Sequence, residues 1–134
     1  CYLLAAGFLG RLCLSGEPSK LTEGNFAVVR EGVRFYQNHV RPFVDRGSLR
    51  IARRLQSESY EQPLGWQAVA RTAEEGGLYV IHAFGNTPAS VELPCIGALE
   101  AVYKPESVVV EVREGGLFVS GLTDFSGLAV VTKV

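Results

Sequence analysis

Two aspartates and two histidines are the side chains of this sequence best suited to acid–base or metal chemistry. Asp45 and Asp124 are its only aspartates, and His39 and His82 are its only histidines. Asp45 follows an expected helix and Asp124 lies in an expected turn, where carboxylates commonly bond the local backbone. The histidines stand far apart and lack the neighbouring ligands of a zinc site. We therefore expect structural roles for all four, and neither a metal nor a cofactor.

Nucleophile and nucleotide motifs are missing from the sequence. Ser15 and Ser126 lack the G-x-S-x-G context of an esterase-type nucleophile. The sequence has no G-x-G-x-x-G and no P-loop motif. Neither serine is therefore expected to act as a triad nucleophile.

Arginines and aromatic residues in the middle of the chain are open to two interpretations. The arginines at positions 46, 50, 53 and 54 have the chemistry to grip an anion, but Glu58 and Glu61 are nearby partners for ion pairs. Trp66 and Tyr60 have rings that can stack on a sugar. Trp66 also begins an expected strand, which favours packing at a seam between the helical region and the sheet.

Composition and charge indicate a packed globular chain. Of its 134 residues, 47% are hydrophobic and 20% charged, which argues against disorder. The net charge is −1 and the isoelectric point about 6.2, so the excess of positive charge that holds nucleic acid is missing. The apolar run from Cys1 to Gly10 is too short to span a bilayer. We expect neither a nucleic-acid partner nor a membrane partner.

The cysteines and the first residues bear on the origin of the chain. Cys1, Cys13 and Cys95 are widely spaced and odd in number, so buried free thiols and a cytoplasmic location are expected rather than a disulfide framework. The chain starts inside an apolar run, and it contains no Met and no recognisable signal peptide. We expect it to be the C-terminal piece of a larger protein.

A long amphipathic helix is predicted from Thr22 to about Arg41. Hydrophobic residues follow one another in steps of 3, 4, 3, 4 and 3, which places them on one helix face: Phe26, Val29, Val33, Tyr36, Val40 and Phe43. Thr22 is suited to cap the N-terminus. Pro42 should end or kink the helix near Arg41, and Gly47 should end whatever continues. A single helix with so wide an apolar face needs a partner surface.

After Gly65 the hydrophobic period changes to two, which indicates short strands. The expected strands are 66–72, 78–84, 89–93, 108–113, 117–120 and 127–134, separated by segments rich in Gly, Asn and Pro. Short strands at this spacing predict an antiparallel β-sandwich. The predicted fold class is α+β, with a long helix followed by this sandwich and joined to it by a connector.

Several segments, in this order, resemble the α-galactosidase-type glycoside hydrolases of family 36 and its clan relatives. The segments are Phe8-Leu-Gly-Arg-Leu-Cys-Leu-Ser-Gly16, Lys20-Leu-Thr22, the helix that contains Val33-Arg-Phe-Tyr36, and Leu64-Gly-Trp66. The resemblance covers nearly the whole chain, and its individual motifs are only moderately specific. It implies that residues 1–47 form the end of a (β/α)8 catalytic barrel, 48–65 a connector, and 66–134 a C-terminal antiparallel β-sandwich domain.

The resemblance also implies what this piece does in its parent enzyme. Leu12–Leu14 would be the eighth barrel strand and Thr22–Arg41 the eighth barrel helix. Ser15 and Gly16 would lie at the rim of the sugar pocket as substrate-binding residues. No residue matches the two catalytic aspartates of the family, so we expect a non-catalytic portion whose partners are carbohydrate, the rest of the parent, or a second copy. The alternative is a carbohydrate-binding or structural oligomerisation β-module without hydrolase activity.

Overall fold

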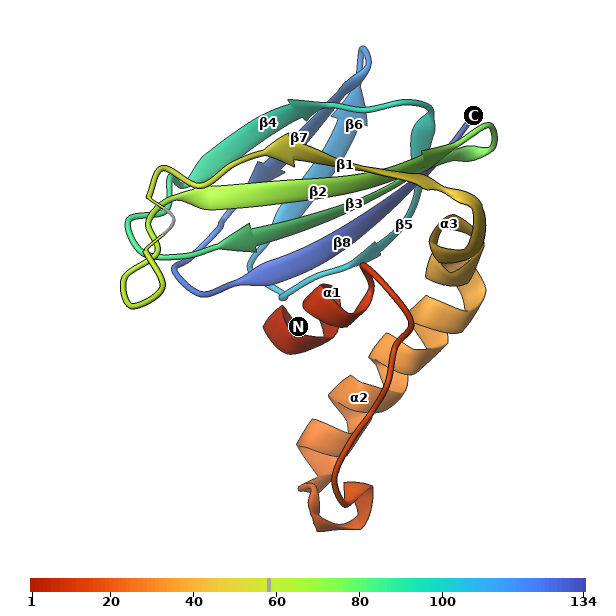
Figure 1. Cartoon of the computed structure of the whole chain (residues 1–134), viewed down its shortest axis with the longest axis vertical. Helices are drawn as coiled ribbons and strands as arrows, with labels where there is room; N and C mark the ends of the chain where they lie inside the picture. The colour runs from red at the N-terminus through yellow and green to blue at the C-terminus, as the bar shows by residue number, and fades with distance from the viewer. Residues whose placement is uncertain (58) are drawn as a thin grey trace.

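The computed structural model describes residues 1–57 and 59–134 as helices packed against one face of a β-sheet, with a second sheet on the other face (Figure 1). The helical elements are α1 (Tyr2–Gly7), the 3-10 turn η1 (Pro18–Lys20), α2 (Glu23–Phe35), the π-helical turn η2 (Tyr36–Val40) and α3 (Arg41–Arg46). The strands are β1 (Ser48–Arg53), β2 (Trp66–Ala73), β3 (Gly76–Ala83), β4 (Ser90–Pro94), β5 (Ala98–Tyr103), β6 (Val109–Arg113), β7 (Gly116–Ser120) and β8 (Gly127–Lys133). The predicted α+β class is confirmed.

The strands form two antiparallel sheets. The five-stranded sheet has the order β1-β2-β3-β8-β5, and the three-stranded sheet has the order β4-β7-β6. All six predicted strands are present, with ends that differ by one or two residues. Strands β1 and β5 were not predicted, and β1 lies inside the expected connector 48–65. That expectation is therefore wrong for residues 48–53, which pair with β2.

The five-stranded sheet is buried on both faces along its centre. Side chains of Tyr79, Ile81 and Val130 point toward the three-stranded sheet and share a core with Val91 and Val119. We call this the inter-sheet core. The two sheets thus enclose hydrophobic side chains in a sandwich-like arrangement.

The alternate residues of the same strands point toward the helices. Leu78, Val80 and Val131 lie in a second cluster with Phe8 and Phe35, which we call the helix-side core. Because β3 and β8 contribute to both cores, they read as nearly continuous apolar runs.

Aromatic rings dominate the helix-side core. The ring centroid of Phe8 lies 5.4 Å from that of Phe35 and 5.3 Å from that of Tyr103. These distances are within the range in which aromatic pairs attract one another. They join α1, α2 and β5, three elements that are far apart in the sequence.

The elements α2, η2 and α3 form one helix of 24 residues that passes through Pro42. Thr22 caps it as predicted, because its Oγ1 accepts a hydrogen bond from the Asn25 N–H at 3.3 Å. Pro42 lacks an N–H, and its ring would collide with the carbonyl of Asn38 in a regular helix. The wider π turn at Tyr36–Val40 relieves this conflict, and the helix continues to Arg46 before Gly47 ends it.

Arg71 of β2 fastens the helical elements to the sheet. Its Nε and one terminal nitrogen donate to the Leu9 carbonyl at 3.0 and 2.8 Å, and the other nitrogen donates to the Gly47 carbonyl at 3.2 Å. Leu9 follows α1 and Gly47 follows α3. One half-buried side chain therefore holds the ends of two helices against the same strand.

Candidate functional site

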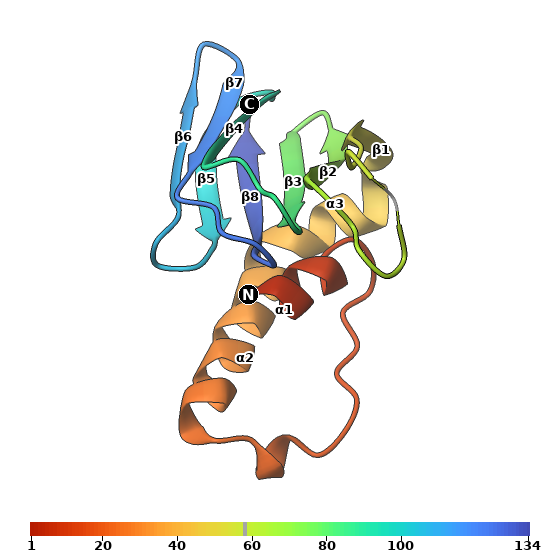
Figure 2. The ribbon, with the colours of Figure 1, turned by 90° about the vertical axis from the view of Figure 1, so that its left-hand side faces the viewer.

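The first half of α2 extends away from the two sheets, as both ribbon views show (Figure 1, Figure 2). Phe26 is 45% exposed and Val28 40%, whereas Val40 and Phe43 at the other end of the helix are buried. Val29 and Val33 are half-buried. The expected apolar side chains therefore do not form one continuous face: Val40 and Phe43, after the π turn, pack on the sheet, whereas the sheets leave the N-terminal half of the helix uncovered.

The segment between α1 and α2 approaches this helix near Tyr36 and stands away from it further along (Figure 2). Together they line a hollow of about 660 Å³ that includes Leu12, Leu14, Val33 and Tyr36. The Tyr36 hydroxyl donates to the Gly10 carbonyl at 3.2 Å and holds the start of the segment in place. The lining of the hollow is mixed, because Arg11, Gln37, Arg41 and Asp45 also contribute to it.

Leu49 and Ile51 are further exposed hydrophobic residues, on the five-stranded sheet. Both belong to β1 and are 53% exposed. On β2 they pair with Arg71 and Val69, which in turn pair with Leu78 and Val80 of β3. Leu78 and Val80 belong to the helix-side core, so Leu49 and Ile51 also lie on the helix side of the sheet. We use the name open helical face for the hollow beside α2 and the exposed hydrophobic residues on and before the projecting helix, Leu14, Leu21, Phe26 and Val28. Phe26 and Val28 are two residues apart and therefore point to different sides of the helix.

Ser15 and Gly16, the expected substrate-binding residues, lie in the exposed segment before η1. Gly16 adopts a φ of +100°, a left-handed conformation that favours glycine. Neither residue lines the neighbouring hollow. Residues 12–14 were expected to be a barrel strand, but they form no strand here, because no other described segment pairs with them.

Trp66 occupies a different place from the one expected. It begins β2 and packs half-buried against the inter-sheet core, not at the seam with the helices. The opposite end of β2 carries Arg71, which bonds Gly47 after α3. The guanidinium carbon of Arg53 lies 5.5 Å from the centroid of the Trp66 ring. The predicted ion pairs of the arginines with Glu58 fall on a residue outside the described part.

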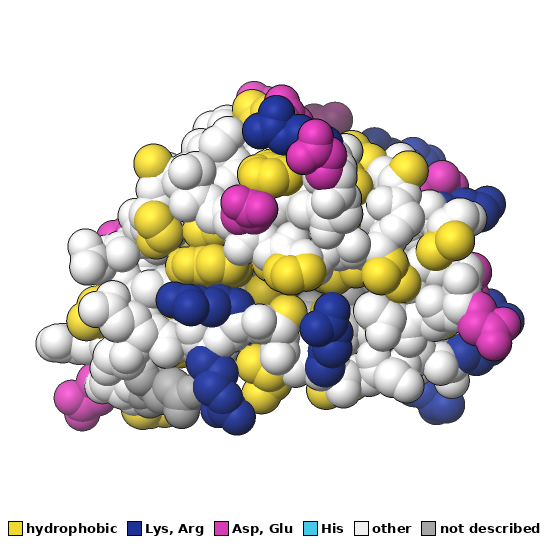
Figure 3. All heavy atoms as spheres, turned by 90° about the horizontal axis from the view of Figure 1, so that it is seen from above, with side chains coloured by type: hydrophobic (Ala, Val, Ile, Leu, Met, Phe, Trp, Pro, Cys, Tyr) yellow, Lys and Arg dark blue, Asp and Glu magenta, His cyan; other side chains and the backbone are white. Residues whose placement is uncertain are grey.

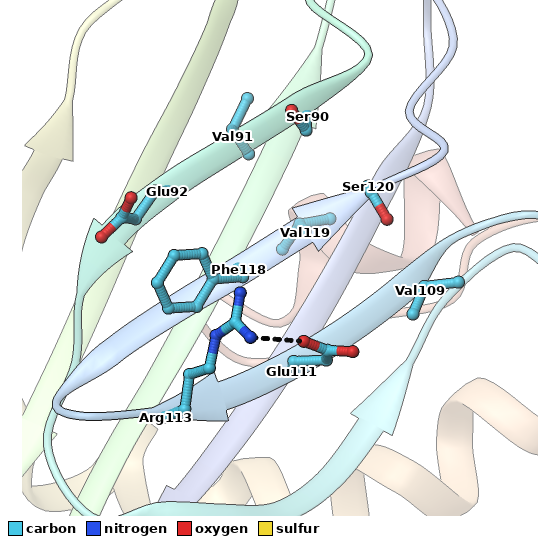
Figure 4. A pocket seen from close by; sticks show the side chains of 9 residues that line it. All are labelled: Ser90, Val91, Glu92, Val109, Glu111, Arg113, Phe118, Val119 and Ser120. Carbon is cyan, nitrogen blue, oxygen red and sulfur yellow. Dashed lines mark ion pairs between the residues drawn. The ribbon is translucent and has the colours of Figure 1, made fainter.

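A second hollow, of about 480 Å³, lies on the outer face of the three-stranded sheet (Figure 4). Phe118 of β7 stands between Glu92 of β4 and Glu111 of β6, which are its cross-strand partners. The guanidinium of Arg113 lies 4.6 Å from the Phe118 centroid, and its nitrogen is 3.8 Å from the Glu111 carboxylate.

The two carboxylates of this hollow are solvated groups. Two strand spacings, about 10 Å, separate their Cα atoms. Glu92 and Glu111 are both exposed, and no described element forms a further layer over this face. They lack the enclosed cleft in which glycosidase carboxylates act.

The two histidines have separate environments. His82 is 4% exposed, and its Nε2 donates to the Tyr2 carbonyl at 3.1 Å, which ties α1 to β3. Burial lowers the pKa of His82, and the hydrogen bond to Tyr2 partly offsets this effect. His39 lies on the π turn, with its ring 5.4 Å from that of Phe35. No group of three potential metal ligands occurs among the residues that the structure describes.

The aspartates form local contacts. The Asp124 carboxylate accepts a hydrogen bond from the Thr87 N–H at 3.0 Å, which lowers the pKa of Asp124. Asp45 lies 3.7 Å from Arg41, one helical turn earlier. Both positions agree with the expected structural roles.

Of the three cysteines, only Cys95 is buried, and burial raises the pKa of its thiol. Cys13 is exposed and Cys1 half-buried, so the expectation of buried thiols is wrong for Cys13. Cys13 is exposed because it lies in the segment between α1 and α2, which projects from the rest of the chain.

No helix in the described part of the chain has the length and apolar character needed to cross a membrane.

Seen from above, hydrophobic side chains form a band across the molecule with Lys and Arg side chains along it (Figure 3). The strands on this side in Figure 1 include β1 and β4, which are edge strands of the two sheets. The apolar surface of the chain is therefore exposed on more than one side.

We compared the chain with models of protein families, with curated proteins and with solved structures, and none of the three comparisons found a match.

Proposed function

We propose that this chain is the C-terminal, non-catalytic portion of a glycoside hydrolase similar to the α-galactosidases of family 36. The parent protein would hydrolyse O-glycosyl bonds. The observation that carries this proposal is the first half of α2, which projects from the sheets (Figure 1) and leaves Phe26 and Val28 exposed. Exposed apolar surface of this kind marks a site of association.

In this proposal, α2 is the last helix of the catalytic barrel. Such a helix packs its apolar face against the barrel strands. The exposed half of α2 and the hollow beside it supply a face of this kind. The two sheets act as a β-sandwich domain that braces the barrel from outside, since the buried half of the helix already packs on the five-stranded sheet.

Ser15 and Gly16 are proposed to reach the rim of the sugar pocket in the assembled enzyme. They lie in the exposed segment before α2, where loops that follow barrel strands carry binding residues. The two carboxyl groups that cleave the bond would come from earlier strands of the parent. Glu92 and Glu111 do not replace them, because both are exposed on the outer sheet face.

The proposed partners are the rest of the parent enzyme and its carbohydrate substrate. When the rest is missing, we expect the open helical face to pair with a second copy. The free cysteines favour a cytoplasmic location for the parent, since reduced thiols persist there.

The reading frame that precedes the codon for Cys1 tests this proposal. We expect it to encode earlier barrel strands, with two aspartates at the ends of two of them. The extended protein should hydrolyse an aryl α-galactoside, and the 134-residue chain alone should not. An upstream region that encodes no barrel, or turnover by the chain alone that survives rigorous purification, would overturn it.

A further inference from the structure

A pocket of about 380 Å³ lies at the end of the two sheets where β2 begins. Trp66, Arg53, Gln56, Asn86 and Thr87 line it. We infer that this pocket binds a pyranose ring of a carbohydrate. The inference does not rest on the proposed function, because the pocket is formed within this chain by residues that do not belong to the open helical face.

The pocket has a fixed backbone frame. The Gly65 N–H donates to the Gly85 carbonyl at 2.8 Å, and the Phe84 N–H donates to the Gly65 carbonyl at 2.9 Å. These bonds join the segment before β2 to the loop after β3. The walls on both sides of Trp66 are therefore held together before any ligand arrives, which reduces the entropy lost on binding.

The loop that carries Asn86 and Thr87 is tied down independently. The Thr87 N–H donates to the Asp124 carboxylate at 3.0 Å, and the Thr87 hydroxyl donates to the Phe84 carbonyl at 2.7 Å. Asn86 adopts a φ of +58°, which asparagine tolerates better than most residues. These bonds fix the backbone of the loop from which Asn86 lines the pocket.

The side chains of the pocket match the chemistry of a sugar ring. A pyranose has apolar C–H faces and hydroxyl groups that both donate and accept hydrogen bonds. The half-buried indole of Trp66 offers an apolar face, and the amides of Asn86 and Gln56 both donate and accept. Among the residues that the structure describes, no carboxylate lines the pocket.

Arg53 covers the Trp66 ring in the free protein. Its guanidinium carbon is 5.5 Å from the ring centroid, near the outer limit of a cation–π contact, and its side chain is exposed. A contact this weak is easily exchanged. A sugar that stacks on Trp66 would displace the guanidinium, which can then donate to a ring hydroxyl.

Fluorescence provides a direct test, because Trp66 is the only tryptophan of the chain. We would titrate the full chain separately with galactose, glucose and mannose and record its tryptophan emission. At least one of these pyranoses should produce a saturable change. Mannitol, an acyclic polyol without a ring face, should produce none at the same concentrations.

Two matched variants locate the site. Asn86→Ala should raise the half-saturating sugar concentration about tenfold, the effect of losing one well-placed hydrogen bond. Asn38→Ala makes the same change on the π turn and should leave the titration unaltered. Thermal melts of both variants establish that they are folded before the titrations are compared.

Three results would overturn the inference: no saturable change with any of the pyranoses, an equal change with mannitol, or equal weakening by the two variants. None of these results alters what the upstream reading frame encodes. Failure of the sugar site is therefore distinguishable from failure of the proposed function.

Discussion

The centre of the five-stranded sheet and the first half of α2 are both rich in hydrophobic residues, yet they differ in what covers them. Leu78, Val80, Leu128 and Val130 are fully buried, because helices cover one face of the sheet and the second sheet covers the other. Phe26 and Val28 of α2 remain 45% and 40% exposed. The sheet obtains its apolar contacts within this chain, whereas the helix has an apolar face that still lacks a partner.

The largest effect should come from a cavity on the covered side. Leu128→Ala removes a fully buried side chain from the inter-sheet core and should lower the free energy of unfolding by about 2–5 kcal/mol. Urea denaturation of the two proteins measures the difference. A loss below about 1 kcal/mol would mean that this core is loosely packed, and the contrast with α2 would weaken.

The next largest effect concerns the contact between the helices and the sheet. Arg71→Ala removes the bonds to the Leu9 and Gly47 carbonyls and should cost about 1.5–3 kcal/mol, the usual worth of hydrogen bonds to a charged group. Arg113→Ala on the exposed outer sheet face is the control and should have little effect. Equal losses in the two variants would show that Arg71 does not fasten the helical layer.

Acid should lower the stability of the buried sheet through protonation of His82 on β3. Burial lowers the folded-state pKa of His82 below the ordinary value of about 6.5, so the unfolded chain binds the proton more readily. The stability due to neutral His82 is present above pH 6.5 or so and is lost as the pH falls through the folded-state pKa. The slope should approach about 1.4 kcal/mol per pH unit.

The free energy of unfolding should be measured between about pH 7.5 and 5, in roughly half-unit steps around the ordinary histidine pKa. The original chain should show this slope, and the His82→Gln variant should not. Near His82 lie the Tyr2 and Phe84 rings and the Tyr2 carbonyl. His39→Gln, on the π turn, serves as the matched control. The same slope in His82→Gln would assign the acid effect to other groups.

The smallest effect on stability should come from the open helical face. Phe26→Ser combined with Val28→Ser changes exposed side chains, so the free energy of unfolding should shift by only about 0.5 kcal/mol per site. The same double variant should weaken self-association of the original chain, as measured by sedimentation over a wide concentration range. A chain that is monomeric throughout that range would contradict the idea that this face seeks a second copy.

Elements with a clear period were predictable from the sequence, and elements that depend on packing were not. The strand β8 is rich in β-branched residues and was predicted. The helix α1 has six residues and no side-chain cap, so its stability depends on tertiary contacts, chiefly with β3 and β8. The strand β5, Ala-Leu-Glu-Ala-Val-Tyr, contains residues with low strand propensity and forms because β8 offers it a partner edge.

The strand β1 has an alternating pattern of hydrophobic and polar residues, although it was not predicted. Leu49 and Ile51 alternate with polar residues, but arginines dominate the segment and a bulge after Ile51 shifts its register. Its apolar side chains are also exposed, which is unusual for a strand that packs on a core. The expected connector therefore begins only after β1.

The exposed helical face was predictable in outline, but the buried face was not. Gly32 is buried where α2 comes close to Leu4 and Tyr103. A Cβ atom at this position would lie 2.8 Å from the Leu4 side chain and 3.3 Å from the Tyr103 hydroxyl. A count of hydrophobic positions overlooks a glycine that permits close approach. The Trp66 pocket joins three segments through backbone bonds, and no spacing in the sequence indicates that they meet.

The π turn also determines the direction in which α2 presents its side chains. The buried residues of the long helix, Gly32, Phe35, Val40 and Phe43, follow one another in steps of three, five and three. An α-helix turns by about 100° per residue, so a step of five does not return to the same side unless the turn is widened. Residues 36–40 thus act as a phase shift between two helical segments. Deleting one residue there would rotate Phe26 and Val28 by about a quarter turn relative to the sheet.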